Sequence, residues 1–305
     1  MVIGIQSRRI IKVDLENPGK KTHRNTIYKI KECLKPELGE FLGTMVLVTF
    51  GDGVVAQVRL SNQNAGNYTS IALGWASAVM LGFVASGGDP GHLNPGVTIS
   101  AAIFRRFRWK RVPSVILAQL LGGFIGSCVV YATYVGSINQ FEGGPDIRSI
   151  FGEKETASIF CTFPQSYLTW SQKFISELIP SILLQIGIFS LSDFHGHTSP
   201  SNTCLPIGLF ILILAIGSSF GFQTGYAINM ARDFAPRVAA SFLGYGVTMF
   251  TAYDHYFWIP IVAPIIGCII GSIIYDTLIY TGDDSRINQK VFGVTKKMKI
   301  SSTYF

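Results

Sequence analysis

Two asparagine-centred segments are the residues of this chain best suited to bind a small polar molecule. The first reads GHLNPG and contains Asn94, and the second reads GYAINMA and contains Asn229. Each lies downstream of an isolated glutamate in an apolar stretch: Asn94 is 54 residues after Glu40, and Asn229 is 52 residues after Glu177. Such near-equal spacing indicates that the two halves of the chain repeat one arrangement.

Both motifs carry the residues with which a short helix begins. Asparagine is among the best N-cap residues, and Pro95 occupies the favoured first helical position. Residues 94–104 and 229–238 are too short to cross a bilayer, so we expect two half-helices. If they enter from opposite faces, their positive dipole ends point at one place. There the field disfavours cations, and the Asn94 and Asn229 amides donate hydrogen bonds to a passing molecule.

Long uncharged apolar blocks must position these half-helices. Hydrophobic residues make up 48% of the 305-residue chain and charged residues only 14%, against about 25% in soluble domains. A membrane helix needs about 20 mostly apolar residues. Six stretches qualify, although the fifth is long for a single span: 38–58, 71–86, 113–139, 174–192, 205–231 and 256–275.

Three spans in each half place the second copy of the repeat upside down in the membrane. In inverted repeats the functional site lies near the midplane between the copies. The sequence therefore predicts an all-α membrane protein with six transmembrane helices and two re-entrant half-helices. We expect a basic segment at 1–36, a membrane domain at 37–280 and a tail at 281–305. The repeats run over about 37–134 and 173–280, joined by an outer loop at 135–172.

Basic residues indicate the orientation of the spans. Of the 25 lysines and arginines, 19 lie before the first predicted span, between the second and third, or after the sixth. The positive-inside rule then puts both termini in the cytoplasm, and the plasma membrane is the expected location. The sequon Asn67-Tyr68-Thr69 falls in the first outer loop, so Asn67 is a candidate glycosylation site.

Several classes of function are excluded by the same observations. The net charge of +7 is confined to chain ends and one loop, without a basic helix interleaved with aromatics, which argues against nucleic-acid binding. Five cysteines are too few and odd in number for a disulfide scaffold. The string Gly217-Ser218-Ser219-Phe220-Gly221 matches G-x-S-x-G but lies inside an uncharged span. We expect no enzyme activity, no cofactor and no metal.

Taken together, the motifs resemble the major intrinsic proteins, the aquaporin family, and within it the aquaglyceroporins. The resemblance covers about 37–280 and is carried by HLNPGVTIS at 92–100, GYAINMARDFAPR at 225–237 and the two glutamates. It implies the aquaporin fold, a pore in each protomer and a homotetramer in the lipid bilayer. It also implies that Glu40 and Glu177 are buried acceptors for backbone N–H groups of the re-entrant loops, with His92 and Asp233 as further structural positions.

The central triplets depart from the family pattern of Asn-Pro-Ala twice. Here the first is Asn94-Pro95-Gly96 and the second Asn229-Met230-Ala231. Both asparagines are kept, so we expect a functional pore. Gly96 predicts a methyl-sized gap where the half-helices touch, which Met230 could fill.

The resemblance also assigns a selectivity filter. Motif offsets give Gly217, Tyr226 and Arg232, and a one-residue deletion before the first motif gives Trp75. Two aromatics form an apolar corner for the carbon edge of a polyol, and Arg232 faces its hydroxyls with a rigid fork of donors. Gly217 opens the space that the second aromatic fills. The fixed charge of Arg232 repels cations and hydronium.

The resemblance implies a passive channel for glycerol, other small uncharged solutes and water that excludes ions and protons. Alternatives are a mainly water-selective pore, a secondary transporter or ion channel, and a closed junction protein. Gly217 argues against the first, and the paired asparagine half-helices do not supply the ion ligands that the second requires. Asp52 and Asp89 have no role in this interpretation.

Overall fold

A computed structural model describes residues 25–193, 204–282, 285 and 287–288. The chain divides into two units, Met1–Lys35 and Pro36–Phe305. The described part of the first unit is helix α1 (Thr26–Cys33), which has no buried residue. Its N-terminus is capped by Asn25, whose side chain accepts a hydrogen bond from the Tyr28 N–H at 2.9 Å.

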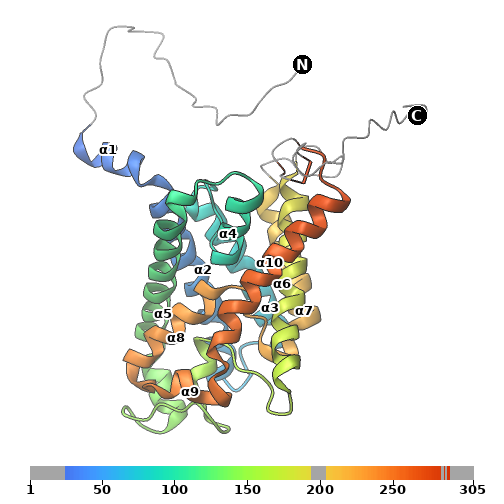
Figure 1. Cartoon of the computed structure of the whole chain (residues 1–305). Helices are drawn as coiled ribbons and strands as arrows, with labels where there is room; N and C mark the ends of the chain where they lie inside the picture. The colour runs from blue at the N-terminus through green and yellow to red at the C-terminus, as the bar shows by residue number, and fades with distance from the viewer. Residues whose placement is uncertain (1–24, 194–203, 283–284, 286, 289–305) are drawn as a thin grey trace. The chain divides into compact units, whose positions relative to one another are not determined.

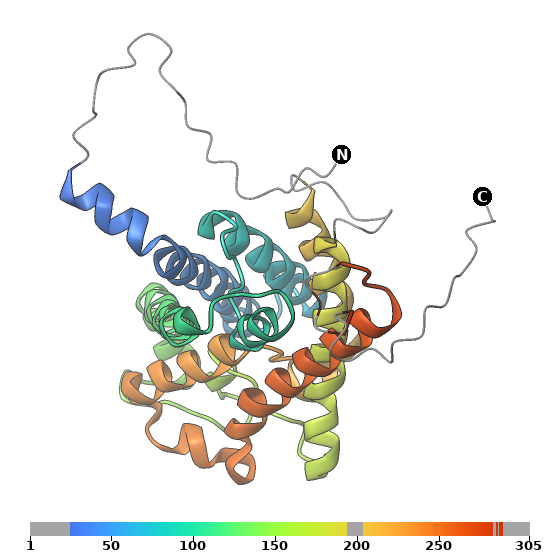
Figure 2. The same cartoon turned by 45° about the horizontal axis from the view of Figure 1, so that its top comes forward.

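Within the described residues, six helices are long and apolar enough to span a membrane. This agrees with the six predicted spans, and no strand occurs in the described part of the chain. The six are α2 (Lys35–Leu60), α3 (Tyr68–Ser86), α5 (Val112–Glu142), α6 (Trp170–Ser192), α7 (Leu205–Thr224) and α10 (Ile259–Leu278). Helix α10 packs along α6 and against the short helix α4 (Figure 2).

Two short helices, α4 (Pro95–Phe104) and α8 (Met230–Ala240), are the predicted half-helices. In Figure 1, α4 lies in the upper half of the second unit and α8 in the lower half. The long apolar block at 205–231 contains both the end of a span and the start of α8. Helix α7 ends at Thr224, and Gly225 adopts φ 83°, a left-handed conformation that glycine reaches without a Cβ penalty.

Helices approach closely at paired glycines. Cβ atoms added at Gly39 and Gly43 of α2 would lie 2.6 Å from the Ser86 carbonyl oxygen and 2.7 Å from the Gly82 carbonyl oxygen of α3. In the other half, Gly267 and Gly271 of α10 meet backbone carbonyls of α6 in the same way. Small residues of this kind let helix backbones touch within a membrane.

The connection between the halves, from α5 to α6, is anchored by a buried carboxylate. Helix α5 continues to Glu142, so the first eight residues of the predicted loop are helical. Glu142 accepts hydrogen bonds from the Ser149 N–H and the Thr156 hydroxyl, both at 2.6 Å, and pairs with Arg148 at 3.2 Å. Tyr245 is hydrogen-bonded to Thr156 in the same cluster, and burial raises the pKa of its phenol.

Other short elements lie in the connections between the longer helices. They are η1 (Trp109–Arg111), η2 (Ala157–Ile159), η3 (Ser241–Tyr245), α9 (Thr248–His255) and η4 (Tyr256–Trp258). Directly after α4, Arg105 forms a bidentate ion pair with Asp276 and lies between the rings of Phe189 and Tyr280, 3.9 Å from each centroid. Ser285 donates to Asp276 at 2.6 Å, so the start of the predicted tail packs against the membrane domain.

Candidate functional site: a cavity between two half-helices

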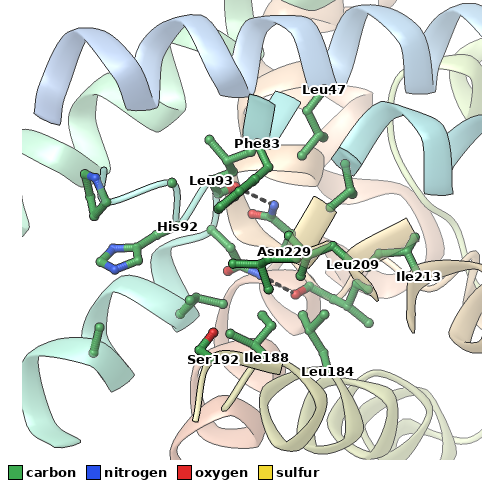
Figure 3. Close-up of a pocket in the computed structure, with 18 of the residues that line it drawn as sticks. Leu47, Phe83, His92, Leu93, Leu184, Ile188, Ser192, Leu209, Ile213 and Asn229 are labelled. Atoms are coloured by element: carbon green, nitrogen blue, oxygen red, sulfur yellow. Dashed lines mark hydrogen bonds between the residues drawn. The ribbon is translucent and has the colours of Figure 1, made fainter. Parts of the chain in front are cut away.

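A cavity of about 820 Å³ lies within the second unit. Its wall passes from Arg105, beyond the end of α4, through both asparagines to Trp75, Tyr226 and Arg232. Figure 3 shows Asn229 and Leu93 at the centre, with apolar side chains around them, among them Leu47, Leu184 and Ile213. The cavity wall therefore carries few polar groups and is otherwise apolar.

Asn94 and Asn229 are bound to each other's loops in a reciprocal pattern. The Asn94 Nδ2 donates to the Ile228 carbonyl at 2.9 Å, and the Asn229 Nδ2 donates to the Leu93 carbonyl at 2.8 Å. Each Oδ1 caps its own half-helix by accepting a backbone N–H at 2.9 Å, from Gly96 and Ala231 respectively. One N–H of each amide is left for a molecule in the cavity, because an amide has two donors.

The two glutamates hold the re-entrant loops in unusual backbone conformations. Glu40 accepts the N–H groups of His92 at 2.6 Å and Leu93 at 2.7 Å. Glu177 accepts those of Ala227 at 3.0 Å and Ile228 at 2.9 Å. Leu93 and Ile228 both have positive φ, 52° and 45°, which costs a non-glycine residue about 1–3 kcal/mol. The fully buried carboxylates hold these conformations in place and thereby aim the carbonyls that receive the asparagine amides.

Three of the four predicted filter side chains meet at the cavity wall. The Arg232 guanidinium carbon lies 3.9 Å from the centroid of the Trp75 ring, a cation–π contact. Gly217 does not line the cavity but lies behind Tyr226, where an added Cβ would be 3.0 Å from Cζ and from Oη. Gly217 thus provides the room that the Tyr226 ring occupies, as the sequence predicted.

Arg232 has a donor without a partner in this region. Its side chain is 8% exposed, and its Nη1 makes no hydrogen bond to any described residue. Trp75 and Tyr226 present apolar surface close to it. The arrangement can therefore donate hydrogen bonds to one edge of a small molecule while contacting its carbon skeleton on another.

Next to Arg232, Asp233 holds the segment between α5 and α6 to α8. Its Oδ2 accepts from the Thr162 N–H at 2.7 Å and from the Thr162 hydroxyl at 2.6 Å, and its Oδ1 pairs with Arg237 at 2.9 Å. Arg237 also donates to the Thr162 carbonyl at 2.7 Å. Asp233 was predicted as a structural position. Thr162 and Arg237 were not, although the spacing of four residues between Asp233 and Arg237 on a helix is a signal for that pair.

Two residues that contact the predicted filter residues were not found from the sequence. Tyr68 donates from its hydroxyl to the Gly217 carbonyl at 2.7 Å, across 149 positions of chain. Gly51 lies against the Trp75 ring, because a Cβ added there would overlap the ring carbons. Neither residue has a local sequence signal, since both contacts depend on how α2, α3 and α7 are rotated against one another.

The predicted gap at Gly96 is wrong. A Cβ added at Gly96 would lie 3.1 Å from the Cys268 Sγ and 3.1 Å from the Pro264 carbonyl, both in α10. A methyl group at position 96 would therefore point at the closely packed helix α10. Its absence leaves no space between the half-helices for Met230 to fill. Met230 is half-buried at the first position of α8.

The remaining predicted residues have simpler surroundings. The His92 side chain lines the cavity and packs edge-on against Phe107, with ring centroids 5.0 Å apart. Asn67 is exposed, and its Oδ1 caps α3 by accepting the Thr69 N–H at 2.9 Å. Its glycosylation stays a prediction. No group of three or more His, Cys, Asp or Glu within the described ranges could hold a metal ion.

Six spanning helices and two half-helices that meet at capped asparagines around a cavity define an inverted-repeat membrane protein of the channel type. Residues 27–275 match the major intrinsic protein (MIP) family, and the chain belongs to that family. It is therefore an integral, multi-pass membrane protein of a family of channels.

Named relatives and a solved structure agree with this assignment. The chain is 47% identical over 254 residues to the probable aquaglyceroporin-2 of Gibberella zeae, covering 83% of this chain and 75% of the relative. It is 45% identical over 270 residues to aquaglyceroporin-9 of Botryotinia fuckeliana, covering 88% of this chain and 59% of that longer relative. The X-ray structure of the aquaglyceroporin from Plasmodium falciparum superposes with a TM-score of 0.72 at 32% identity, covering 81% of this chain and 96% of that one.

Proposed function

We propose that this protein is a passive channel for glycerol and other small uncharged solutes together with water. The observation that carries the proposal is the position of the Arg232 Nη1, which donates to no described residue, beside the aromatic surfaces of Trp75 and Tyr226 at one cavity wall. A polyol has hydroxyl groups on one edge and C–H groups on the other, so it fits such a site. The names of the relatives support the same class of solute.

Passage beyond the filter uses the asparagine centre. A solute that leaves Arg232 meets the free N–H groups of Asn94 and Asn229, while the opposite wall is apolar. As the solute moves, these protein donors replace, one after another, the hydrogen bonds that it made to water. Its hydroxyl groups therefore keep some hydrogen-bond partners along the route. Apolar contacts on the other side keep the binding weak enough for release.

Exclusion of ions and protons rests on two positive elements. The N-termini of α4 and α8 both begin at the central asparagines, so their partial positive charges add there. Arg232 adds a full positive charge at the filter. We infer that cations and hydronium are rejected at both points. Anions are rejected because the largely apolar cavity wall cannot replace the water that they would lose.

We further propose that both termini are cytoplasmic, that the plasma membrane holds the protein and that it assembles as a homotetramer with one pore in each protomer. The excess of basic residues on one side supports the orientation. Membership of the family supports the assembly. We also propose that the channel acts without enzymatic activity, cofactor or metal.

Stopped-flow light scattering on proteoliposomes tests the proposed solute class. Vesicles containing the protein are exposed to glycerol or sorbitol gradients and compared with protein-free vesicles. We expect rapid re-swelling in glycerol and none above the protein-free rate in sorbitol. Fast shrinkage without glycerol re-swelling would indicate a water-selective pore, and no acceleration of either would indicate a closed protein.

A further inference from the structure

We propose that Tyr68 is a positioning residue of the filter, and that its hydroxyl sets the distance between the two aromatic walls, Trp75 and Tyr226. Tyr68 does not line the cavity and acts through the helix that it holds, α7. The inference rests on the proposed filter and adds to it a residue of α3 for which the sequence carries no local signal.

The backbone at Tyr68 is fixed by the first turn of α3. Asn67 caps the helix by accepting the Thr69 N–H at 2.9 Å, and the Ser70 hydroxyl accepts the Asn67 N–H at 3.2 Å in return. These bonds form a capping box, which satisfies otherwise unpaired donors at the start of a helix. Tyr68, the first residue of α3, therefore projects its side chain from a well-defined position.

The Tyr68 hydroxyl binds α7 at two glycines. It donates to the Gly217 carbonyl at 2.7 Å. The same oxygen lies against Gly221, one helical turn along α7, because a Cβ added at Gly221 would overlap it. Tyr68 thus joins α3 to α7 both by a hydrogen bond and by a close approach that the absence of a side chain at position 221 permits.

The Tyr226 ring packs against the same two glycines. A Cβ added at Gly221 would lie 2.6 Å from its Cδ1, and one added at Gly217 would lie 3.0 Å from its Cζ. Tyr226 follows Gly225, the C-cap of α7, so its ring folds back along the helix that it has just left. The Tyr68 hydroxyl and the Tyr226 ring therefore meet α7 at one place, and a shift of α7 moves the support of that ring.

Trp75 lies on the same side of α3 as Tyr68. Seven positions correspond to nearly two turns of an α-helix, so the two side chains leave α3 in similar directions. The Trp75 ring lines the cavity beside Arg232, and α3 packs against α7. The hydrogen bond from Tyr68 to Gly217 thus connects the helix that carries Trp75 with the helix that supports Tyr226, and it fixes the spacing of the two walls.

Removal of the hydroxyl has a defined consequence for the filter. Tyr68→Phe keeps the ring but removes the hydrogen bond to α7. The two aromatic walls then separate more easily, and polyols larger than glycerol gain room relative to glycerol. Arg232 and the N-termini of α4 and α8 are unchanged by the substitution, so protons are excluded as before.

The test measures erythritol, glycerol and proton entry with the full-length protein reconstituted in liposomes. Tyr167→Phe is the matched control, because Tyr167 is an exposed tyrosine of the segment between α5 and α6 and does not line the cavity. Trp75→Phe shortens one wall of the filter. Tyr68→Phe, Trp75→Phe and the double variant complete a double-mutant cycle.

We expect Tyr68→Phe to raise the ratio of erythritol flux to glycerol flux about two- to tenfold, the factor that corresponds to the loss of one hydrogen bond. Proton entry should stay at the wild-type rate, and Tyr167→Phe should keep the wild-type ratio. In the Trp75→Phe background, the increase caused by Tyr68→Phe should be at most half as large, because the wall that Tyr68 positions is already shortened.

The inference is overturned by a folded Tyr68→Phe protein with the wild-type ratio, since the hydrogen bond would then not set the spacing of the filter. An equal increase in the wild-type and Trp75→Phe backgrounds would assign Tyr68 to general packing of α3 against α7. A rise in proton entry together with the ratio, or failure of Tyr68→Phe to fold, would do the same. A Trp75→Phe protein with the wild-type ratio would instead refute the proposed filter itself, whatever the ratio in Tyr68→Phe.

Discussion

Gly51 provides the sharpest mechanical test of the filter. A Cβ added at Gly51 would overlap the Cε3, Cζ3 and Cη2 atoms of Trp75, whereas carbon atoms normally stay about 3.5–4.0 Å apart. In Gly51→Ala the ring must therefore withdraw by more than about 1 Å. Arg232 lies against the ring face at 3.9 Å and both side chains line the cavity, so the displacement disturbs the cavity wall at the proposed filter.

The expected loss of flux follows from the strain of overpacking. Inserting a methyl group into a packed site typically costs about 1–3 kcal/mol. If that cost appears as an added barrier to permeation, glycerol flux falls roughly five- to 150-fold. Water is smaller and should be slowed less.

The measurement is glycerol and water flux in proteoliposomes, normalised to the amount of folded protein. Gly53→Ala, two positions along α2, is the control, because an added Cβ there meets nothing within 4 Å. Equal glycerol flux in folded Gly51→Ala and Gly53→Ala would refute the reasoning, since the Trp75 ring would then not bound the passage.

Three further substitutions test other parts of the account. Gly217→His should reduce glycerol flux much more than water flux by stopped-flow light scattering, because the imidazole displaces Tyr226; an unchanged flux ratio would place the constriction elsewhere. Arg232→Val should admit a proton leak, seen with a pH-sensitive dye, while neutral flux stays measurable; wild-type proton tightness would leave exclusion to the half-helix dipoles. Asp233→Asn should destabilise the protein by about 3–5 kcal/mol, because Arg237 is left buried without its partner; a thermal-unfolding midpoint equal to wild type would contradict this.

The central motif was predictable because its signals are local. An N-cap asparagine, a following proline at one of the two sites and two apolar blocks of the right length predict α4 and α8 within two residues at their ends. The repeated spacing to Glu40 and Glu177 then indicates the repeat, and three spans in each half indicate its inversion. The resemblance supplied the roles of the two carboxylates as loop acceptors, and their hydrogen bonds have that form.

The sequence could not show in which direction a side chain points from one helix toward its neighbours. The missing methyl of Gly96 faces α10 because of how α4 is rotated about its axis, and no pattern within residues 92–100 records that rotation. The contact of Tyr68 with Gly217 and that of Thr162 with Asp233 likewise join segments 149 and 71 residues apart.

The central claim, that uncharged polyols pass while protons do not, is tested most directly by recording both in one preparation. Proteoliposomes loaded with a pH-sensitive dye are given a glycerol gradient and then a pH gradient. The account predicts glycerol entry well above the protein-free rate, with proton entry equal to that of protein-free vesicles. Proton entry that rises in proportion to glycerol entry would contradict it, because the half-helix dipoles and Arg232 would then form no barrier to charge.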